Sequence, residues 1–227
     1  FTDNGYVVTQ YSEQRKRRVE DRPFAKHLVR MRRQSDIDKH FPGSIAGHAT
    51  VGDVIPEILM KASHDRTCPL EFMLGFYRFV CANGLVTGDV FENFGRIYHR
   101  QNNPFERVLE QVESIYKIAD HKSNVIDAMK SKQLDDSEVS RLLTQATYLM
   151  PERVYNAPRE LLTANREDDI GNSLWLTFNR IQENLIKGTD QHIRTATSRI
   201  FKARPIKAID RNIDINQRLW NLAESFI

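Results

Sequence analysis

At 227 residues, with 40% hydrophobic and 28% charged residues, the chain has the composition of a globular protein with one large domain or two small ones. No apolar run approaches the roughly 20 residues that a membrane span needs, and the first residues lack the basic-then-apolar pattern of a signal peptide. Two cysteines cannot build a disulfide framework, so we expect a reducing compartment of the cell.

The net charge of +3 is unevenly distributed along the chain. Between Glu13 and Arg33 there are nine Lys and Arg against three acidic residues, and between Arg194 and Arg218 there are seven against two. The segment from Phe105 to Asn172 holds thirteen acidic residues against nine basic ones. Two basic clusters around an acidic middle indicate a face that binds polyanions.

The first part of the chain predicts strands. Tyr6–Tyr11 is a β-branched and aromatic run typical of a strand, and the basic cluster Arg15–Arg18 follows as an exposed hairpin tip. From Phe24 to Arg33 apolar and basic residues alternate, which predicts a strand with one solvated cationic face. Ser35–Thr50 is loop-like because it contains a Pro-Gly pair and a further glycine.

The stretch from Val51 to Arg100 holds the densest apolar runs between clear turn signals, so we expect it to form the core of a sheet. A strand from Asp53 to Lys61 leads through a polar turn into a second strand, Leu70–Cys81, in which both faces are largely apolar. We therefore place the second strand at the centre of the sheet. Pro56 predicts an edge position or a bulge in the first strand, and an Asn83-Gly84 turn introduces a third strand.

After Pro104 the apolar residues recur at helical spacing. With Asn103 as N-cap, Pro104 opens the first of four expected helices, and Gly188 follows the third. The helices are predicted over Phe105–Ala119, from Asp135 or Asp136 to Pro151, over Asn172–Lys187 and over Ile213–Phe226. The expected fold is α+β, with residues 1–104 as a mainly β core that carries the basic strand. Residues 105–227 then form a mainly helical half that packs on this core in one composite domain.

Several blocks of the sequence resemble a phage/plasmid-like protein family, a domain-of-unknown-function family of mobile elements. These blocks are Val51-Gly52-Asp53, Ser63-His64-Asp65, Arg78–Val86, His99-Arg100, Leu174-Trp175 and Asn216–Ala223. The similarity extends from Phe24 to the end, and Arg78–Gly84 is its most specific part. The chain departs from the family's pattern at Ala62, where the family has Asn, and at Arg66, where it has Gly.

The resemblance implies a mobile-element origin, the cytoplasm of a bacterial host, and a role in DNA transactions or in evading host defence. A strand-rich half with a cationic strand and a following helix is also loosely similar to the core of single-strand annealing recombination proteins.

The basic clusters are the strongest functional signal, because Lys and Arg bind nucleic-acid backbones by releasing condensed counterions. We expect a non-enzymatic single-stranded DNA-binding protein without a cofactor, working as a homo-oligomer in strand annealing. The predicted phosphate contacts are Arg15, Arg17, Arg18, Lys26, Arg30, Arg32, Arg33, Arg199, Lys202 and Arg204. This requires both clusters to share one solvent-facing surface; the alternative for the first cluster is a solvated strand that only maintains solubility.

Two alternative functions belong to other classes. One is an inhibitor that binds a host defence complex through its charged surface. The other is a metal-dependent nuclease, for which the candidate side chains are His64, Asp65, Asp53, Asp89, Glu92 and His99. A simple polar turn at Ser63-His64-Asp65 competes with the nuclease hypothesis, and the sequence lacks a Gly-rich phosphate loop for an NTPase. We expect Cys81, Trp175 and Trp220 to pack in the core.

Overall fold

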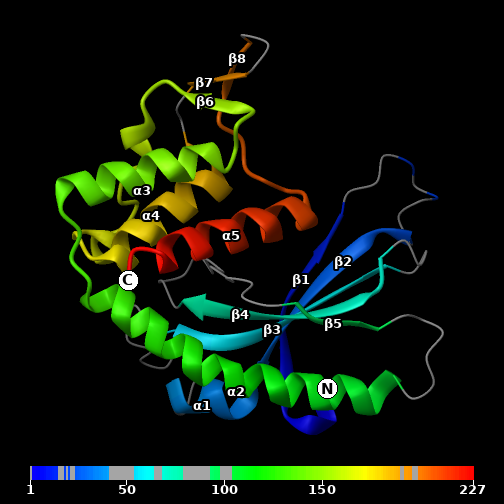
Figure 1. Ribbon diagram of the computed structural model, residues 1–227. Helices are drawn as coiled ribbons and strands as arrows, with labels where there is room; N and C mark the ends of the chain where they lie inside the picture. The colour runs from blue at the N-terminus through cyan, green and yellow to red at the C-terminus, as the bar shows by residue number, and fades with distance from the viewer. Residues whose placement is uncertain are drawn as a thin grey trace. The chain divides into compact units, whose positions relative to one another are not determined.

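The computed structural model describes residues 2–14, 18, 20, 24–40, 54–63, 68–78, 93–97, 104–189, 192–195 and 199–227. The chain divides into two compact units, Phe1–His121 and Lys122–Ile227, and each is described by itself. The first unit contains an antiparallel sheet, and the second contains helices and a smaller sheet (Figure 1). The predicted α+β fold, with an N-terminal antiparallel sheet before a helical half, is confirmed.

Five antiparallel strands form the sheet of the first unit in the order β1-β2-β3-β4-β5. They are β1 Tyr6–Glu13, β2 Lys26–Arg33, β3 Val54–Ser63, β4 Leu70–Arg78 and β5 Asn93–Ile97. Each strand pairs with its neighbour in sequence, which is the commonest arrangement for locally connected strands. The strands predicted from Tyr6, Phe24, Asp53 and Leu70 are confirmed as β1 to β4.

Strands β3 and β4 supply the apolar centre of this sheet. In β3 Ile55, Ile58 and Leu59 are fully buried, and in β4 every residue from Glu71 to Phe76 is buried. Because successive side chains of a strand point to opposite faces, β4 is covered on both sides. It is an inner strand between β3 and β5, covered on both faces as predicted, although the middle strand of the sheet is β3.

Strand β3 is also an inner strand, contrary to the edge position that Pro56 predicts. Pro56 lies opposite Phe76 of β4, whereas β2 pairs with β3 from Ile58 to Ser63. The proline therefore lies beyond the end of the β2 pairing, where its missing N–H removes no hydrogen bond to β2. Pro56 therefore indicates only that one end of β3 is not paired with β2, and it does not indicate the position of the whole strand in the sheet.

The cationic face predicted for β2 is not solvated, so this prediction is wrong. Arg30 is 7% exposed and pairs with Glu57 of β3, which is fully buried. Arg32 contacts the second carboxylate oxygen of Glu57 at 3.3 Å. A second ion pair, between Lys61 and Glu71, joins β3 to β4. The Glu57 carboxylate of β3 thus neutralises two cations that the sequence of β2 alone presents as a surface row.

Helices α1 Gln34–His40 and α2 Pro104–Ser131 complete the described part of the first unit, with α2 continuing into the second. Helix α1 occupies the start of the segment predicted as a loop, and residues 41–50 lie outside the described residues. Helix α2 begins at Pro104 as predicted but extends well beyond Ala119. A short 3-10 helix, η1 Thr2–Asn4, precedes β1. Cys81, Asn83-Gly84 and the predicted cap Asn103 also lie outside the described residues.

The second unit contains α3 Asp136–Tyr148, α4 Leu174–Lys187 and α5 Ile209–Glu224. Asp135 caps α3 by accepting from the Glu138 N–H at 2.8 Å, and the Glu138 carboxylate accepts from the Asp135 N–H at 3.1 Å. The hydrogen bond from the Glu138 N–H is the main reason why the pKa of the Asp135 carboxyl is lowered. The side chain of Ser173 caps α4. Helices α3 and α4 lie where the sequence predicts them, whereas α5 begins about one turn before the predicted start.

Aromatic side chains hold α4 and α5 together in the second unit. The rings of Trp175 and Phe178 stack with their centres 5.8 Å apart, and Phe178 meets Trp220 edge-to-face at the same distance. Both tryptophans are buried, so their predicted core position is confirmed. Two 3-10 helices, η3 Pro158–Leu162 and η4 Glu167–Asp169, connect α3 to α4.

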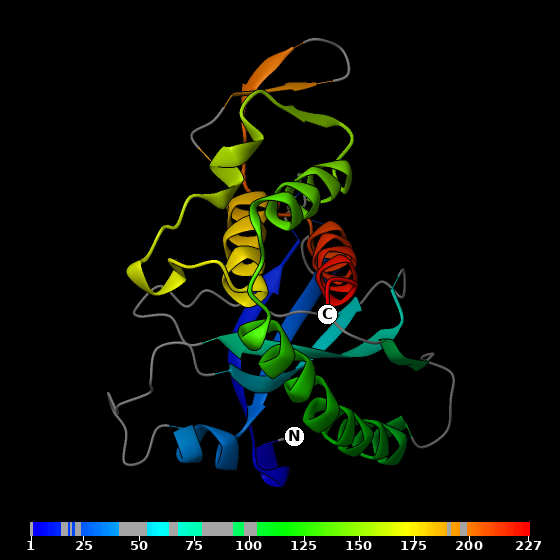
Figure 2. The same ribbon diagram turned by 60° about the vertical axis from the view of Figure 1, so that its left-hand side comes forward.

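A three-stranded sheet that the sequence did not predict lies at one end of the second unit (Figures 1 and 2). Its strands are β6 Arg153–Tyr155, β7 His192–Thr195 and β8 Ile200–Lys202, paired antiparallel in the order β6-β7-β8. Among the described helices of both units, none is both long and apolar enough to cross a membrane.

Candidate nucleic-acid interface

The first predicted basic cluster, from Arg15 to Arg33, is largely not a free surface. Arg15 and Arg17 lie outside the described residues, Arg18 is exposed, and Lys26 is half-buried at the start of β2. Arg30 and Arg32 pair with Glu57, as described above. Of this cluster the structure therefore presents Arg18 to solvent and uses the two central arginines inside the sheet.

Arg33 packs against aromatic rings and so fixes α2 on the sheet. Its guanidinium carbon lies 3.8 Å from the centre of the Tyr116 ring, and its guanidinium donates to the Tyr6 hydroxyl at 3.3 Å. The backbone N–H of Arg33 donates to the Tyr116 hydroxyl at 3.2 Å. Burial, followed by the charge of Asp36, strongly raises the pKa of Tyr116. These contacts give Arg33 a structural position at the junction of β2 and α2.

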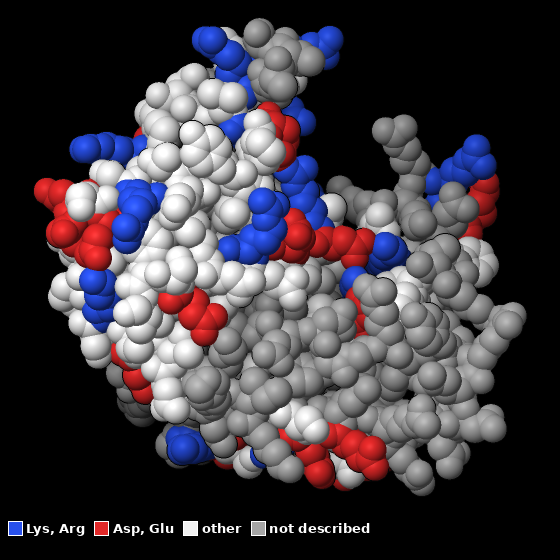
Figure 3. Space-filling model, in the orientation of Figure 1, with Lys and Arg blue, Asp and Glu red and all other residues white. Residues whose placement is uncertain are grey.

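The second predicted cluster is exposed. Arg199, Lys202 and Arg204 all lie on or beside β8, and all three are accessible to solvent. Arg194 of β7 is exposed beside them, although it was not among the predicted contacts. Lys and Arg side chains gather over this end of the second unit (Figure 3).

The strand register places basic and apolar side chains together on one face of this sheet. Arg194 lies between Val154 of β6 and Ile200 of β8, and cross-strand partners share a face. Val154 is 51% exposed and Ile200 is 59% exposed, and Lys202 lies two residues beyond Ile200 on the same face. We call the face formed by Val154, Arg194, Ile200 and Lys202 the basic sheet face.

The opposite face of the small sheet packs on the unit. It carries Tyr155, Ile193 and Phe201 in register, of which the first two are buried and Phe201 is 42% exposed on the outer strand. Burial raises the pKa of the Tyr155 hydroxyl. The Arg153 guanidinium donates to the backbone carbonyl of Arg204 at 3.0 Å, so β6 is tied to the segment that follows β8. The basic sheet face is therefore supported from behind by a packed layer.

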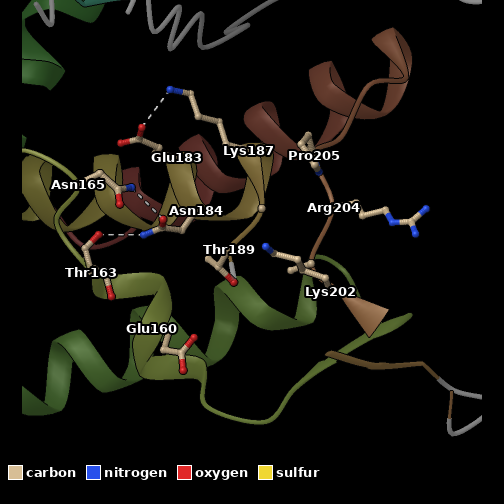
Figure 4. Close-up of a pocket in the computed structure, with 12 residues that line it drawn as sticks. Glu160, Thr163, Asn165, Glu183, Asn184, Lys187, Thr189, Lys202, Arg204 and Pro205 are labelled. Atoms are coloured by element: carbon tan, nitrogen blue, oxygen red, sulfur yellow. Dashed lines mark hydrogen bonds and ion pairs between the residues drawn. The ribbon is translucent and has the colours of Figure 1, made fainter. Parts of the chain in front are cut away.

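A cavity of about 590 Å³ lies beside β8, between η3, the end of α4 and residues 202–205 (Figure 4). Its wall on α4 is fixed by hydrogen bonds. The Asn184 amide donates to the carbonyls of Leu161 and Thr163 at 3.0 Å each and accepts from Asn165 at 3.1 Å. Both amide N–H groups and the side-chain oxygen of Asn184 are thus engaged in hydrogen bonds.

The next residue on this wall, Glu183, is held by a bidentate ion pair. Arg166 donates to its two oxygens at 2.9 and 2.6 Å and also contacts Asp169 at 3.1 Å. Lys187 donates to the same carboxylate at 3.1 Å. The charge of Glu183, which is buried, is therefore compensated within the wall.

Gly188 allows the chain after β8 to close the cavity. Its φ of 78° lies in the left-handed region, and a Cβ at this position would collide with the carbonyl oxygen of Ala203. The Ile206 N–H then donates to the Ile186 carbonyl at 2.8 Å and fixes the crossing. A side chain at position 188 would thus displace the backbone that lines the cavity.

The candidate nuclease residues His64, Asp65, Asp53, Asp89, Glu92 and His99 lie outside the described residues. Among the residues that the structure does describe, His, Cys, Asp and Glu form no group of three that could hold a metal ion.

Sequence reasoning identified the second cluster but missed the sheet that displays it. The apolar contribution of Val154 and Ile200 and the cavity beside Lys202 were also missed. The alternation of apolar and polar residues in His192–Thr195 and Ile200–Lys202 is the signal that could have indicated the two strands. The two predicted clusters lie in different units, and their predicted meeting on one surface stays a prediction.

The fold and this site define an α+β protein with a basic sheet face in its second unit. The chain belongs to the family described as Domain of unknown function (DUF932), whose model matches residues 5–220. The resemblance seen in the sequence is thus confirmed at the level of a family of unknown function.

Two relatives from Escherichia coli (strain K12) match the same large part of the chain. The UPF0380 protein YafZ is 33% identical over 208 residues, which is 91% of this chain and 70% of the relative. The UPF0380 protein YfjQ is 32% identical with the same coverage of both chains. No solved structure matches the chain.

Proposed function

We propose that the protein binds single-stranded nucleic acid, with DNA favoured, through the basic sheet face and the adjoining Arg199 and Arg204. The observation that supports this is the register of β6, β7 and β8, which places exposed Arg194 and Lys202 next to exposed Val154 and Ile200. Cations follow a phosphate backbone, and exposed apolar side chains contact unpaired bases, so the combination suits a single strand.

Phe201 lies on the opposite face of the outer strand β8 from the basic sheet face, and its ring is partly exposed to solvent. It is 42% exposed on the outer strand and is flanked in sequence by Ile200 and Lys202. Base–aromatic stacking tolerates any sequence because every base has a flat face. A partly exposed ring on the outer strand, with Arg199 and Lys202 nearby in the chain, is therefore compatible with binding that does not depend on sequence.

We further propose that the activity is strand annealing by a homo-oligomer in a phage or plasmid context. The similarity to annealing proteins and to mobile-element families noted in the sequence supports this proposal. Annealing requires no chemistry from the protein, since base pairing supplies the free energy once a strand is held with its bases presented.

Replacing Phe201 by alanine should weaken binding of a single-stranded oligonucleotide about tenfold, since stacking on one aromatic ring contributes roughly 1–3 kcal/mol. The measurement is a fluorescence anisotropy titration with a labelled oligonucleotide at fixed salt. Tyr148→Ala is the matched control, because Tyr148 is an exposed aromatic residue of α3 in the same unit. Equal losses for both variants, or no loss for Phe201→Ala, would count against stacking at β8.

A further inference from the structure

Strand β1 is an edge of the five-stranded sheet in the first unit. Among the described strands it pairs with β2 alone, along one of its two sides. The side chains of Val8 and Tyr11 on this strand are 52% and 59% exposed. From Tyr6 to Ser12 the strand contains no charged residue and no proline, which are common devices that protect an edge from pairing with another chain. The outer side of β1 is therefore suited to accept a further strand.

The hydrogen bonds at the ends of β1 establish which of its backbone groups face outward. After the strand, the Gln14 N–H donates to the Lys26 carbonyl at 2.8 Å. Consecutive residues of an antiparallel pair direct their backbone groups alternately toward the partner strand and away from it. Because Gln14 faces β2, the backbone N–H and carbonyl groups of Glu13 and Tyr11 face away from β2, toward the outer edge.

The same alternation, counted from the other end of the strand, gives Val8 an outward-facing backbone. Before the strand, the Gln34 N–H donates to the Gly5 carbonyl at 2.8 Å, so Gly5 faces β2 and Val8, three residues further on, faces outward. The register with β2 shifts by one residue just after Val8, which marks a β-bulge at Thr9. The outward-facing residues Val8 and Tyr11 are therefore three positions apart instead of two.

This bulge favours a second copy of the chain over other strands as the partner of β1. A regular strand has outward-facing groups at every second residue and falls out of step with Val8 and Tyr11. A copy of β1 has the same spacing of three. When two copies are aligned antiparallel about a two-fold axis, Val8 of each lies opposite Tyr11 of the other, and Glu13 falls opposite Tyr6. The outward-facing groups then coincide, and no like charges are opposed.

We propose that the protein forms a homodimer in which the β1 strands of two copies pair antiparallel and join the two sheets edge to edge. The inference names the contact of the homo-oligomer and rests on that part of the proposed function. It does not depend on where nucleic acid binds. Strand addition at an open edge takes its affinity from main-chain hydrogen bonds. The cross-strand contacts between Val8 and Tyr11 would in addition cover two exposed apolar side chains of each copy.

The test places like charges at the predicted contact. In the dimer, Val8→Lys/Tyr11→Lys would set two ammonium groups opposite each other at both symmetric pairs. We expect the wild type to have the mass of two chains in size-exclusion chromatography with light scattering. The variant should raise the dimer dissociation constant about tenfold or more in analytical ultracentrifugation. The control, Asn124→Lys/Gln145→Lys, adds the same charge at two exposed positions of the second unit and should stay dimeric.

Mixing two variants provides a second measurement that depends on the register. Val8→Glu/Tyr11→Glu should also be monomeric by itself, and its mixture with the lysine variant should form a heterodimer, because each ammonium group then lies opposite a carboxylate. The melting temperature of each variant is measured alongside. If a double variant does not fold, the single variants Tyr11→Lys and Val8→Glu take its place, and their heterodimer is required to be tighter than either homodimer.

The possible failures are distinguishable. A lysine variant that stays dimeric, or a mixture that stays monomeric, would overturn the pairing of β1 and leave the homo-oligomer to another contact. A wild type that is monomeric at every concentration would overturn both this contact and the homo-oligomer. Binding of a single-stranded oligonucleotide is measured by anisotropy on the same wild-type sample, so a failure of nucleic-acid binding is seen separately.

Discussion

Replacing Arg194 and Lys202 together by glutamine should weaken binding of a single-stranded oligonucleotide about 25-fold near 0.1 M salt. Each phosphate contact contributes about −0.7 to the slope of log affinity against log salt concentration for single strands. Four cations at this site, Arg194, Arg199, Lys202 and Arg204, give an expected slope of roughly −3 for the wild type. The double variant should lower the magnitude of this salt slope by about 1.4. Anisotropy titrations at several salt concentrations measure both quantities.

The matched control for this variant removes two exposed cations elsewhere in the same unit. Lys130 on α2 and Arg218 on α5 each lie near a carboxylate of their own helix. Replacing both by glutamine changes the net charge equally but should leave the slope close to that of the wild type. A loss of equal size in this control would show that binding depends on net charge alone and not on the basic sheet face.

Replacing Glu57 by glutamine should lower the free energy of unfolding by about 3–5 kcal/mol, the usual cost of leaving buried charges without their partner. Glu57 is fully buried and holds both Arg30 and Arg32 inside the first unit. The neutral amide preserves the shape of the side chain but cannot balance two guanidinium charges. Urea denaturation followed by circular dichroism measures the change.

Glu113→Gln provides the control for this experiment, because Glu113 is exposed on α2 and should change the unfolding free energy by no more than about 0.5 kcal/mol. If Glu57→Gln were as mild as the control, Arg30 and Arg32 would not be held in a buried pair. Arg30 and Arg32 would then be surface cations, and the first cluster would again be a candidate for binding phosphates.

The elements that the sequence predicted well are those with local signals. Helix α3 begins where Asp135 and Glu138 form a capping box. Helix α4 ends before Gly188, and a glycine directly after a helix is a common stop signal because it adopts a positive φ. Strand β4 was predicted as an inner strand covered on both sides because both of its alternating sets of side chains are apolar, and it lies between β3 and β5. Each of these signals is contained within one short segment.

The features that the sequence did not predict depend on contacts between distant residues. The burial of Arg30 follows from a carboxylate 27 positions away on the next strand, which no pattern within β2 reveals. Strands β6 to β8 are only three or four residues long, and they become a sheet because residues near 154 pair with residues near 194. The cavity likewise forms where residues 202–205 close over the end of α4.

The candidate site was therefore predictable in part. The density of Lys and Arg between Arg194 and Arg218 indicated the right region, and Lys202 and Arg204 are exposed there as expected. The density of Lys and Arg alone also predicted Arg30 as a phosphate contact, whereas the structure places Arg30 in a buried ion pair. The two clusters differ in how far their side chains are exposed to solvent. This exposure depends on the folded sheet and not on the local sequence.

Photochemical cross-linking of a single-stranded oligonucleotide that contains 5-iodouracil tests most directly whether the small sheet of the second unit binds the strand. Mass spectrometry of the digested complex identifies the residues joined to the bases. We expect cross-links within residues 192–205, with Phe201 foremost, and their loss at high salt. Cross-links confined to the first unit, or a yield that does not depend on salt, would contradict the assignment of nucleic-acid binding to the basic sheet face.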